Sequence, residues 1–340
     1  MIKTALVTGG CGFVGRRYVS HLSSLGYDVT YVDDLSTGLH SADWPDFIQT
    51  RTNFKNTTFF YEDVREFFKT AYRTNKFNNF DLVVHLAAVV GGRLNLETNP
   101  IAVATDLAID SDFFNYTKKS YNKYSMYYSS SAAYPTKLQT KDGFKILDES
   151  DIDLKNIANP DFTYGWSKLT GEYLNTFIQD HKIVIYRPFS GYGEDQDLTY
   201  PFPSIMKRVL KMEDPIEVWG DGKQSRDFIH IDDCVDISMI LCNNHITGTF
   251  NLSTGIETPF EELIRKTISI AKELKLVDEN YNPSINRLID KPVGVYRRVG
   301  NNNKINKTVK AVNSDPTWNY TYLTLDQGIK LSLLKMKDFV

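Results

Sequence analysis

Two side chains four residues apart, Tyr164 and Lys168, have the types and the spacing of an acid–base pair. On a helix they lie on one face, one turn apart. A nearby ammonium lowers the pKa of a phenol, so the phenolate becomes accessible near neutral pH and can take a proton from a hydroxyl group. Ser129, Ser130 and Ser131 end a predicted strand, where ligands bind in open parallel sheets. Without such neighbours, the same spacing is typical of a solvated helix face.

A glycine-rich turn near the N-terminus predicts a second chemical task, the binding of a dinucleotide. Gly9, Gly12 and Gly15 follow an apolar run and open a helical pattern. Glycines let the backbone approach a pyrophosphate closely, and the helix N-terminus offers free N–H groups. The next strand ends at Asp33 and Asp34, and a carboxylate at Asp33 can accept a hydrogen bond from the ribose 2′-hydroxyl of NAD and repel the 2′-phosphate of NADP. The alternatives are a tight turn without a ligand and, for Asp34, a merely solvated position.

The elements that must position these residues alternate between strand and helix. Apolar strand patterns cover residues 2–7, 29–32, 59–61, 82–86, 126–130 and 183–186, and helical patterns lie near 64–76, 101–120 and 164–181. This alternation predicts an α/β fold with a doubly wound, Rossmann-type parallel sheet. We expect residues 1–188, with a return segment 228–252, to form an NAD-binding domain. Residues 189–227 and 253–340 are expected to form a smaller C-terminal α/β substrate lobe.

Composition narrows the class of protein. The chain has 340 residues, of which 41% are hydrophobic and 24% charged, and its net charge is −3. These values are typical of a folded globular protein, and the lack of a basic excess argues against a nucleic-acid partner. No apolar run reaches the length of a membrane span. Three scattered cysteines fit neither a disulfide framework nor a zinc site. We therefore expect a cytoplasmic protein that binds no metal.

Four segments together resemble one enzyme family. TGGCGFVG at 8–15, HLAA at 85–88, YGWSK at 164–168 and WGDGKQSRDFIHIDD at 219–233 are similar to motifs of extended short-chain dehydrogenases/reductases, in the NAD-dependent nucleotide-sugar epimerase and dehydratase group. The resemblance covers nearly the whole chain. It implies the fold predicted above, NAD as the cofactor, a nucleotide-diphosphate sugar as the substrate and assembly as a homodimer.

The resemblance also implies roles by position. Tyr164 is the acid/base, Lys168 is its partner, and Ser130 is the catalytic hydroxyl, with Ser131 as the alternative. The implied cofactor-binding residues are Gly9, Gly12, Phe13, Val14, Gly15, Asp33, Asp34, Asp63, Val64, Leu86, Ala87, Ala88, Tyr164 and Lys168. The implied substrate-binding residues are Gly91, Gly92, Arg93, Ser130, Ser190, Trp219, Arg226 and Arg298, the last two for the diphosphate, with Arg297 as the alternative to Arg298. For Asp63, a helix N-cap is an equal alternative.

Two short segments favour particular members of this group. VGGR at 90–93 and SSAAYP at 130–135 most resemble GDP-mannose 3,5-epimerase and GDP-fucose synthase. In those enzymes a cysteine two residues after the catalytic serine is an additional acid or base, and this chain has Ala132 there. Inversion at C4 needs no additional acid or base, because the keto sugar only has to rotate in the site between the two hydride transfers.

The sequence therefore predicts an NAD-dependent nucleotide-sugar epimerase that inverts C4 through a transient 4-keto sugar. The alternatives are a dehydratase, a decarboxylase or a reductase on the same scaffold, and, from another class, a non-catalytic dinucleotide-binding protein. The implied homodimer would form through the helices near 101–120 and 164–181. Phe113, Phe114 and Tyr116 are large side chains on the first of these, although they could instead belong to the core.

Overall fold

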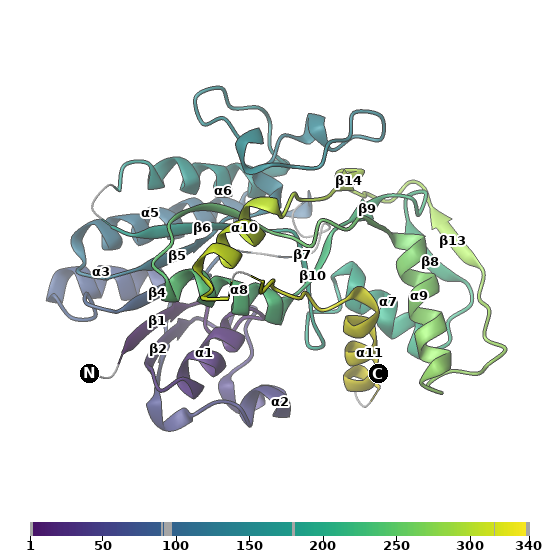
Figure 1. Cartoon of the computed structure of the whole chain (residues 1–340), viewed down its shortest axis with the longest axis horizontal. Helices are drawn as coiled ribbons and strands as arrows, with labels where there is room; N and C mark the ends of the chain where they lie inside the picture. The colour runs from purple at the N-terminus through teal and green to yellow at the C-terminus, as the bar shows by residue number, and fades with distance from the viewer. Residues whose placement is uncertain (1–2, 90, 92–96, 179–180, 316, 338–340) are drawn as a thin grey trace.

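The computed structural model has two parts that lie side by side, and a parallel sheet forms the core of the larger one (Figure 1). The structure describes residues 3–89, 91, 97–178, 181–315 and 317–337. Among the described residues, seven strands pair in the order β11-β6-β5-β4-β1-β2-β3, all parallel. These strands are β1 (Thr4–Thr8), β2 (Asp28–Asp33), β3 (Thr57–Tyr61), β4 (Leu82–His85), β5 (Ser125–Tyr128), β6 (Ile183–Pro188) and β11 (Gly248–Leu252). Central parallel strands are buried on both faces, which explains their nearly continuous apolar sequences.

Helices cover both faces of the sheet. On one face lie α1 (Gly15–Ser24), α8 (Ile231–Asn243) and α10 (Asn303–Val312), and on the other α3 (Val64–Thr74), α5 (Thr105–Lys119) and α6 (Phe162–Asn175). Alternate residues of β1 divide between the two faces: Ala5 and Val7 pack with the first set of helices, and Leu6 packs with the second. The predicted doubly wound, Rossmann-type sheet is therefore confirmed. The short helix α2 (Asp46–Gln49) contacts α1 at the edge of this part.

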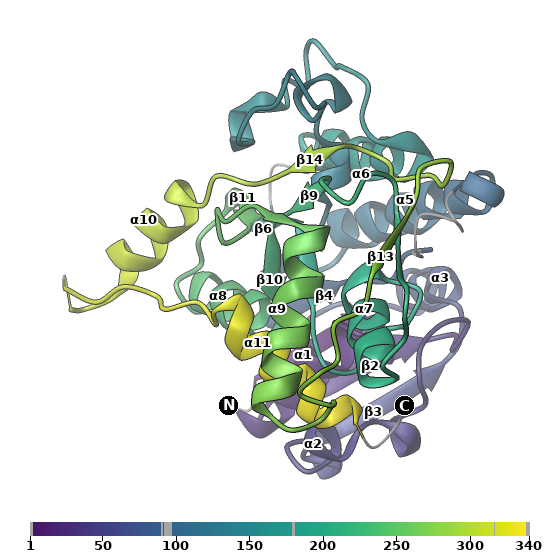
Figure 2. The same cartoon turned by 90° about the vertical axis from the view of Figure 1, so that its right-hand side faces the viewer.

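The smaller part has a core of its own. It contains α7 (Pro201–Leu210), α9 (Phe260–Glu273), α11 (Leu325–Met336) and the parallel pair β8 (Ile216–Trp219) and β13 (Ile285–Leu288). Buried side chains of the three helices meet in one apolar cluster, and Figure 2 shows α9 and α11 adjacent to one another in front of the sheet. The predicted smaller C-terminal lobe is thus present.

Short strands connect the two parts. β7 (Ser190–Tyr192) follows β6 almost directly and pairs in parallel with β10 (Phe228–His230). β9 (Ser225–Arg226) lies between β12 (Thr258–Pro259) and β14 (Arg297–Arg298). The exact domain boundaries stay a prediction. The helix α10, which lies in a segment predicted for the lobe, packs in the same core cluster as α1 and α8.

Candidate active site

The glycine turn is packed too closely to admit side chains. Gly9 has a φ of +66°, and a Cβ there would lie 2.9 Å from the backbone nitrogen of Ala87, just beyond β4. A Cβ on Gly15 would overlap the carbonyl oxygen of Gly9. The turn therefore lies directly against the end of β4, and α1 begins there. Phe13 and Val14 lie at this helix start.

Asp33 holds the glycine turn at the end of β2. Its carboxylate accepts hydrogen bonds from the N–H of Cys11 at 2.9 Å and of Leu35 at 2.8 Å. Burial raises the pKa of this carboxyl, and the two N–H groups oppose that effect. Asp34 instead accepts the N–H of Ser36 at 2.9 Å in an exposed turn. Of the two acidic residues, Asp33 is the one that contacts the turn.

A hydrogen-bonded chain fixes the segment after β4 that the resemblance assigns to the cofactor. The Thr8 hydroxyl oxygen accepts the N–H of Leu86 at 3.2 Å and of Ala87 at 3.3 Å, so its own proton points to Nδ1 of His85 at 2.8 Å. His85 consequently carries its proton on Nε2 and donates to Asp110 at 3.3 Å. Ala88 follows directly after Ala87 in this segment.

Asp63 and Val64 lie at the beginning of α3. The Asp63 side chain accepts the N–H of Arg65 at 2.9 Å and so forms the helix N-cap, the alternative left open by the sequence. Gly91 is a described loop residue, whereas Gly92 and Arg93 lie outside the described residues.

The predicted catalytic residues come together next to the turn after β5. Ser130 caps a short 3-10 helix (Ser131–Ala133) by accepting the N–H of Ala132 at 3.1 Å. A Cβ on Gly165 would overlap the carbonyl oxygen of Ala132, so the N-terminal end of α6 is pressed against this turn. Ser130 and Lys168 both act on the phenol of Tyr164 by lowering its pKa, and Nζ of Lys168 lies 5.8 Å from the centre of the Tyr164 ring.

The phenol of Tyr164 differs in one respect from the expectation. Burial raises the pKa of Tyr164 above its usual value, and Lys168 and Ser130 only partly offset that effect. Lys168 lowers the pKa of this phenol as expected, but the expected net lowering is wrong, because burial outweighs the effect of the ammonium. Two further carboxylates, Asp106 and Asp110, act in the same direction as burial.

Asp106 and Asp110 are residues of this site that the sequence reasoning missed. Both lie on α5, one turn apart, and both are buried. Asp106 accepts the N–H of Val89 at 2.5 Å and lies 3.5 Å from the Ser167 hydroxyl, while Asp110 accepts the Tyr127 hydroxyl at 2.5 Å. Burial and these two carboxylates act on Lys168 in opposite directions, and the carboxylates prevail and raise its pKa. The sequence signal that could have identified them is the presence of two acidic residues one turn apart on a predicted helix.

The substrate-side arginines occupy adjacent strands. Arg298 of β14 is the register partner of Arg226 of β9. The Arg298 guanidinium donates to the Gln139 side chain at 2.6 Å and to Asp161 at 2.7 Å, close to the N-terminal end of α6. Arg297 turns instead to Glu257 at 2.6 Å. The pairing supports Arg298 over Arg297 as the neighbour of Arg226.

Asp227 anchors the strand that carries Arg226. Its buried carboxylate accepts the N–H and the hydroxyl of Thr254, at 2.9 and 2.7 Å, and the N–H of Gly255 at 2.9 Å. Burial raises the pKa of this carboxyl to about 6, against the effect of these donors. Ser190, which opens β7, donates its N–H to the Asp227 carbonyl oxygen at 2.9 Å, and Trp219 ends β8 in the lobe.

Comparison with known proteins decides the family. Residues 5–253 match the sequence model of the NAD dependent epimerase/dehydratase family. The chain belongs to this family. This chain is 29% identical to a provisionally named UDP-glucose 4-epimerase of Methanocaldococcus jannaschii, over 76% of this chain and 79% of that protein. It is 27% identical to a dTDP-4-dehydro-6-deoxy-D-allose reductase of Streptomyces bikiniensis, over 79% of this chain and 81% of the relative.

Solved structures agree on the fold of this epimerase/dehydratase family member. A UDP-N-acetylglucosamine 4-epimerase of Methanobrevibacter ruminantium superposes with a TM-score of 0.78 at 21% identity, over 100% of this chain and 99% of that one. A UDP-glucuronic acid 4-epimerase of Bacillus cereus, solved with UDP-glucuronic acid and NAD, gives 0.77 at 22% identity, over 99% of this chain and 100% of the other. The sequence relatives are named as a UDP-glucose 4-epimerase and an allose reductase, so they do not support the likeness to GDP-mannose 3,5-epimerase and GDP-fucose synthase that two short segments indicated.

The family member has the features that NAD needs. The turn that has no side chains at Gly9 and Gly15, the helix start behind it and the carboxylate of Asp33 form a cradle for a pyrophosphate and an adjacent ribose. The described residues hold no group of His, Cys, Asp and Glu side chains that could bind a metal ion. None of the described helices has the length and apolar character that crossing a bilayer requires.

Replacing Asp106 by asparagine is expected to lower the pKa of Tyr164. The substitution keeps the shape and the acceptor for Val89 but removes a negative charge that opposes Lys168. The effect applies where Asp106 is ionised, above its own pKa of about 6, which burial has raised. With substrate bound, the rise of the NAD-reduction rate with pH should move to lower pH by about one unit.

A matched control is Asp112→Asn on the same helix, because the Asp112 charge acts on Arg65 and Lys69 instead. The pH profile of this control should coincide with that of the wild type. An Asp106→Asn profile that also coincides with the wild type would contradict the role given to Asp106.

Proposed function

We propose that this protein is an NAD-dependent nucleotide-sugar epimerase that inverts C4 through a transient 4-keto sugar. The observation that carries the proposal is the juxtaposition of Tyr164, Lys168 and Ser130 at the sheet edge that also carries the glycine turn, since β5 and β1 are parallel and both lead to that edge. The names of the relatives make UDP-sugars the first substrates to test. When bound, NAD supplies the acceptor and donor of the C4 hydride.

The chain's own side chains would handle the proton and the charge. Tyr164 takes the proton of the C4 hydroxyl and returns it after the sugar has turned over. Lys168, whose ammonium is maintained by Asp110 and Asp106, stabilises the phenolate form of Tyr164 that accepts this proton. Ser130 bridges the C4 oxygen and the phenol. Arg226 and Arg298 hold the diphosphate, for which guanidinium groups have suitable geometry.

The residues around Ser130 support C4 as the position of inversion. Ala132 and Ala133, both buried, follow Ser130 in the turn. Alanine cannot transfer a proton, so the turn supplies neither the extra acid or base of a 3,5-epimerase nor the acidic pair of a 4,6-dehydratase. The likeness to an allose reductase keeps a reductase as the second candidate.

A panel of nucleotide sugars separates these candidates. The purified protein is incubated with UDP-, GDP-, CDP- and dTDP-sugars, and the products are analysed by NMR. The proposal expects a C4 epimer with no net consumption of cofactor, whereas a reductase consumes one reduced nicotinamide for each product. A panel in which no sugar is epimerised would contradict the proposal.

The homodimer stays a prediction, but its predicted contact residues need correction. Phe113, Phe114 and Tyr116 are buried in the core between α3, α5 and the sheet, so they cannot form an interface. Large side chains are exposed instead on the outer side of α5 and α6. They are Leu107, Trp166, Tyr173 and, just beyond α6, Phe177.

Changing both Trp166 and Tyr173 to glutamate is expected to convert a dimer into a monomer. These rings, 44% and 45% exposed, stand seven residues apart on one face of α6, where an apolar patch is a sign of association. Light scattering at micromolar concentration measures the mass. Leu331→Glu, at an exposed position of α11, is the control and should leave the dimer intact. A wild-type monomer under these conditions contradicts the dimer.

A further inference from the structure

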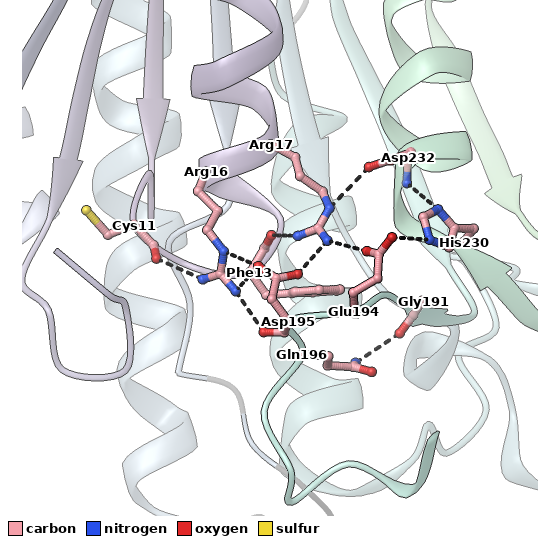
Figure 3. Close-up of polar contacts among 10 residues, drawn as sticks. All are labelled: Cys11, Phe13, Arg16, Arg17, Gly191, Glu194, Asp195, Gln196, His230 and Asp232. Atoms are coloured by element: carbon pink, nitrogen blue, oxygen red, sulfur yellow. Dashed lines mark hydrogen bonds and ion pairs between the residues drawn. The ribbon is translucent and has the colours of Figure 1, made fainter. Parts of the chain in front are cut away.

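A buried ionic cluster joins the beginning of α1 to the loop that follows β7 (Figure 3). Arg16 and Arg17, directly after the last glycine of the turn, have side chains only 4% and 3% exposed. Asp195 lies between them and is 2.5 Å from each guanidinium, and Glu194 lies 3.3 Å from Arg17. The two carboxylates are each 8% exposed. We call Arg16, Arg17, Glu194 and Asp195 the loop clasp.

The same arginines hold the glycine turn. Arg17 donates to the carbonyl oxygen of Phe13 at 2.9 Å, and Arg16 donates to that of Cys11 at 3.4 Å. The guanidinium of Arg17 also lies 4.4 Å from the centre of the Phe13 ring. A Cβ on Gly193 would lie 3.1 Å from the tip of that ring, so the loop packs directly on the turn. The clasp therefore acts on the backbone that would bind the pyrophosphate.

The other end of the loop leads to the substrate side. Gln196 donates to the carbonyl oxygen of Gly191 at 3.0 Å, next to Ser190. The Glu194 carboxylate faces Nε2 of the buried His230 at 3.8 Å, and His230 ends β10, the partner strand of β7. One loop thus contacts both the cofactor turn and the strand pair that borders the sugar site.

Burial makes the clasp sensitive to displacement. If the loop moved away from α1, two guanidinium groups and two carboxylates would each lose a partner in a poorly hydrated place, which is costly. A buried ion pair is weak evidence of stabilisation, because apolar side chains often serve as well. Its distinctive property is that it fixes two segments in one relative position.

We propose that Glu194 and Asp195 are positioning residues that close the cofactor site and keep NAD bound between turnovers. This inference rests on the proposed function, in which the cofactor is recycled and need not leave. The loop would act on NAD through the glycine turn, and not by touching the sugar.

The test measures NAD dissociation from purified protein without any sugar. NAD is loaded, an excess of a competing dinucleotide is added, and its release is followed over time. Asp195→Asn, which keeps the shape but removes the shared charge, is expected to raise the dissociation rate at least about tenfold, as losing one hydrogen bond to a charged group implies. Glu194→Gln should raise it less, because Glu194 contacts one arginine at a longer distance.

Asp232→Asn is the matched control. Asp232 also pairs with Arg17, at 3.2 Å, but its side chain is 48% exposed, so its loss should change the rate by less than about twofold. The thermal unfolding of each NAD-free variant is recorded as well. A purely structural cluster would lower the unfolding temperature and leave the NAD dissociation rate unchanged, and that result would overturn the proposal.

Three further outcomes are separable. If Asp195→Asn does not fold, Glu194→Gln decides, and a wild-type NAD dissociation rate in this folded variant overturns the proposal. A wild-type protein that holds NAD but epimerises no sugar contradicts the proposed function and leaves the clasp measurable. A wild-type protein that binds no NAD contradicts both, and this is seen at the loading step, with no variant needed.

Discussion

Tyr164→Phe is expected to reduce turnover by roughly 10²- to 10⁴-fold, the usual contribution of a positioned acid–base group. The ring still packs on α6 against the turn that holds Ser130, so the binding of NAD and of the nucleotide sugar should stay nearly intact. What disappears is the oxygen that takes the proton from the sugar. The loss should therefore fall on kcat and on single-turnover NAD reduction with the sugar bound.

Three variants sharpen this prediction. Tyr173→Phe, on the same helix with its ring exposed, should behave like the wild type. Ser130→Ala should lose less than Tyr164→Phe, because water or a neighbouring hydroxyl can substitute in part. Lys168→Met should impair both turnover and NAD affinity, since the family resemblance implies that Lys168 serves both Tyr164 and the cofactor. If Tyr164→Phe reduces NAD at the wild-type rate, Tyr164 is not the base.

NAD is expected to bind roughly 100-fold or more tightly than NADP, because like charges brought together at a binding site cost several kcal/mol. The Asp33 carboxylate lies at the edge of the cradle and is held by two N–H groups, so it cannot turn away from a 2′-phosphate without giving up these bonds. Calorimetric titration with both dinucleotides measures the ratio, and the mass of any co-purified cofactor gives an independent check.

Asp33→Asn should shrink this preference. An amide oxygen can still accept one of the two N–H groups, but the charge that repels the phosphate is gone. Asp34→Asn is the matched control, because Asp34 caps an exposed turn and should leave the ratio unchanged. Equal or tighter binding of NADP by the wild type is incompatible with the role given to Asp33.

Local patterns in the sequence were sufficient for the sheet and for the residues next to it. The apolar runs around Ala5 and Val83 predict buried parallel strands, because such strands are covered on both faces. The glycine turn and the spacing of Tyr164 and Lys168 are also local, so the chain order of strands and helices is enough to relate them. The likeness of the remaining motifs to one family then supplied Arg226 and Arg298.

Contacts between distant segments could not be predicted in this way. Arg16 and Arg17 have the sequence context of exposed helix residues, and their partner Asp195 lies far along the chain. In the sequence, Asp106 and Asp110 likewise have the spacing of an exposed polar helix face, whereas in the structure α6 and β5 bury them. The same limit explains the error at Phe113, since only the packing of α3 on α5 shows which side of the helix faces inward.

The pairing of β9 with β14 has a consequence for how the sugar site is completed. The two strands come from distant parts of the chain, and β14 offers only two residues to the pair. A diphosphate that binds Arg226 and Arg298 together would hold β9 and β14 in their paired arrangement. Ligand that binds only the paired form stabilises it by mass action. The N–H groups of Ser225 and Asp227 donate across this pair to the carbonyl oxygens of Tyr296 and Arg298. Amide hydrogen exchange at Ser225 and Asp227 should then be the most responsive backbone signal when the nucleotide sugar arrives, because a short strand at the edge of a small sheet opens easily on its own.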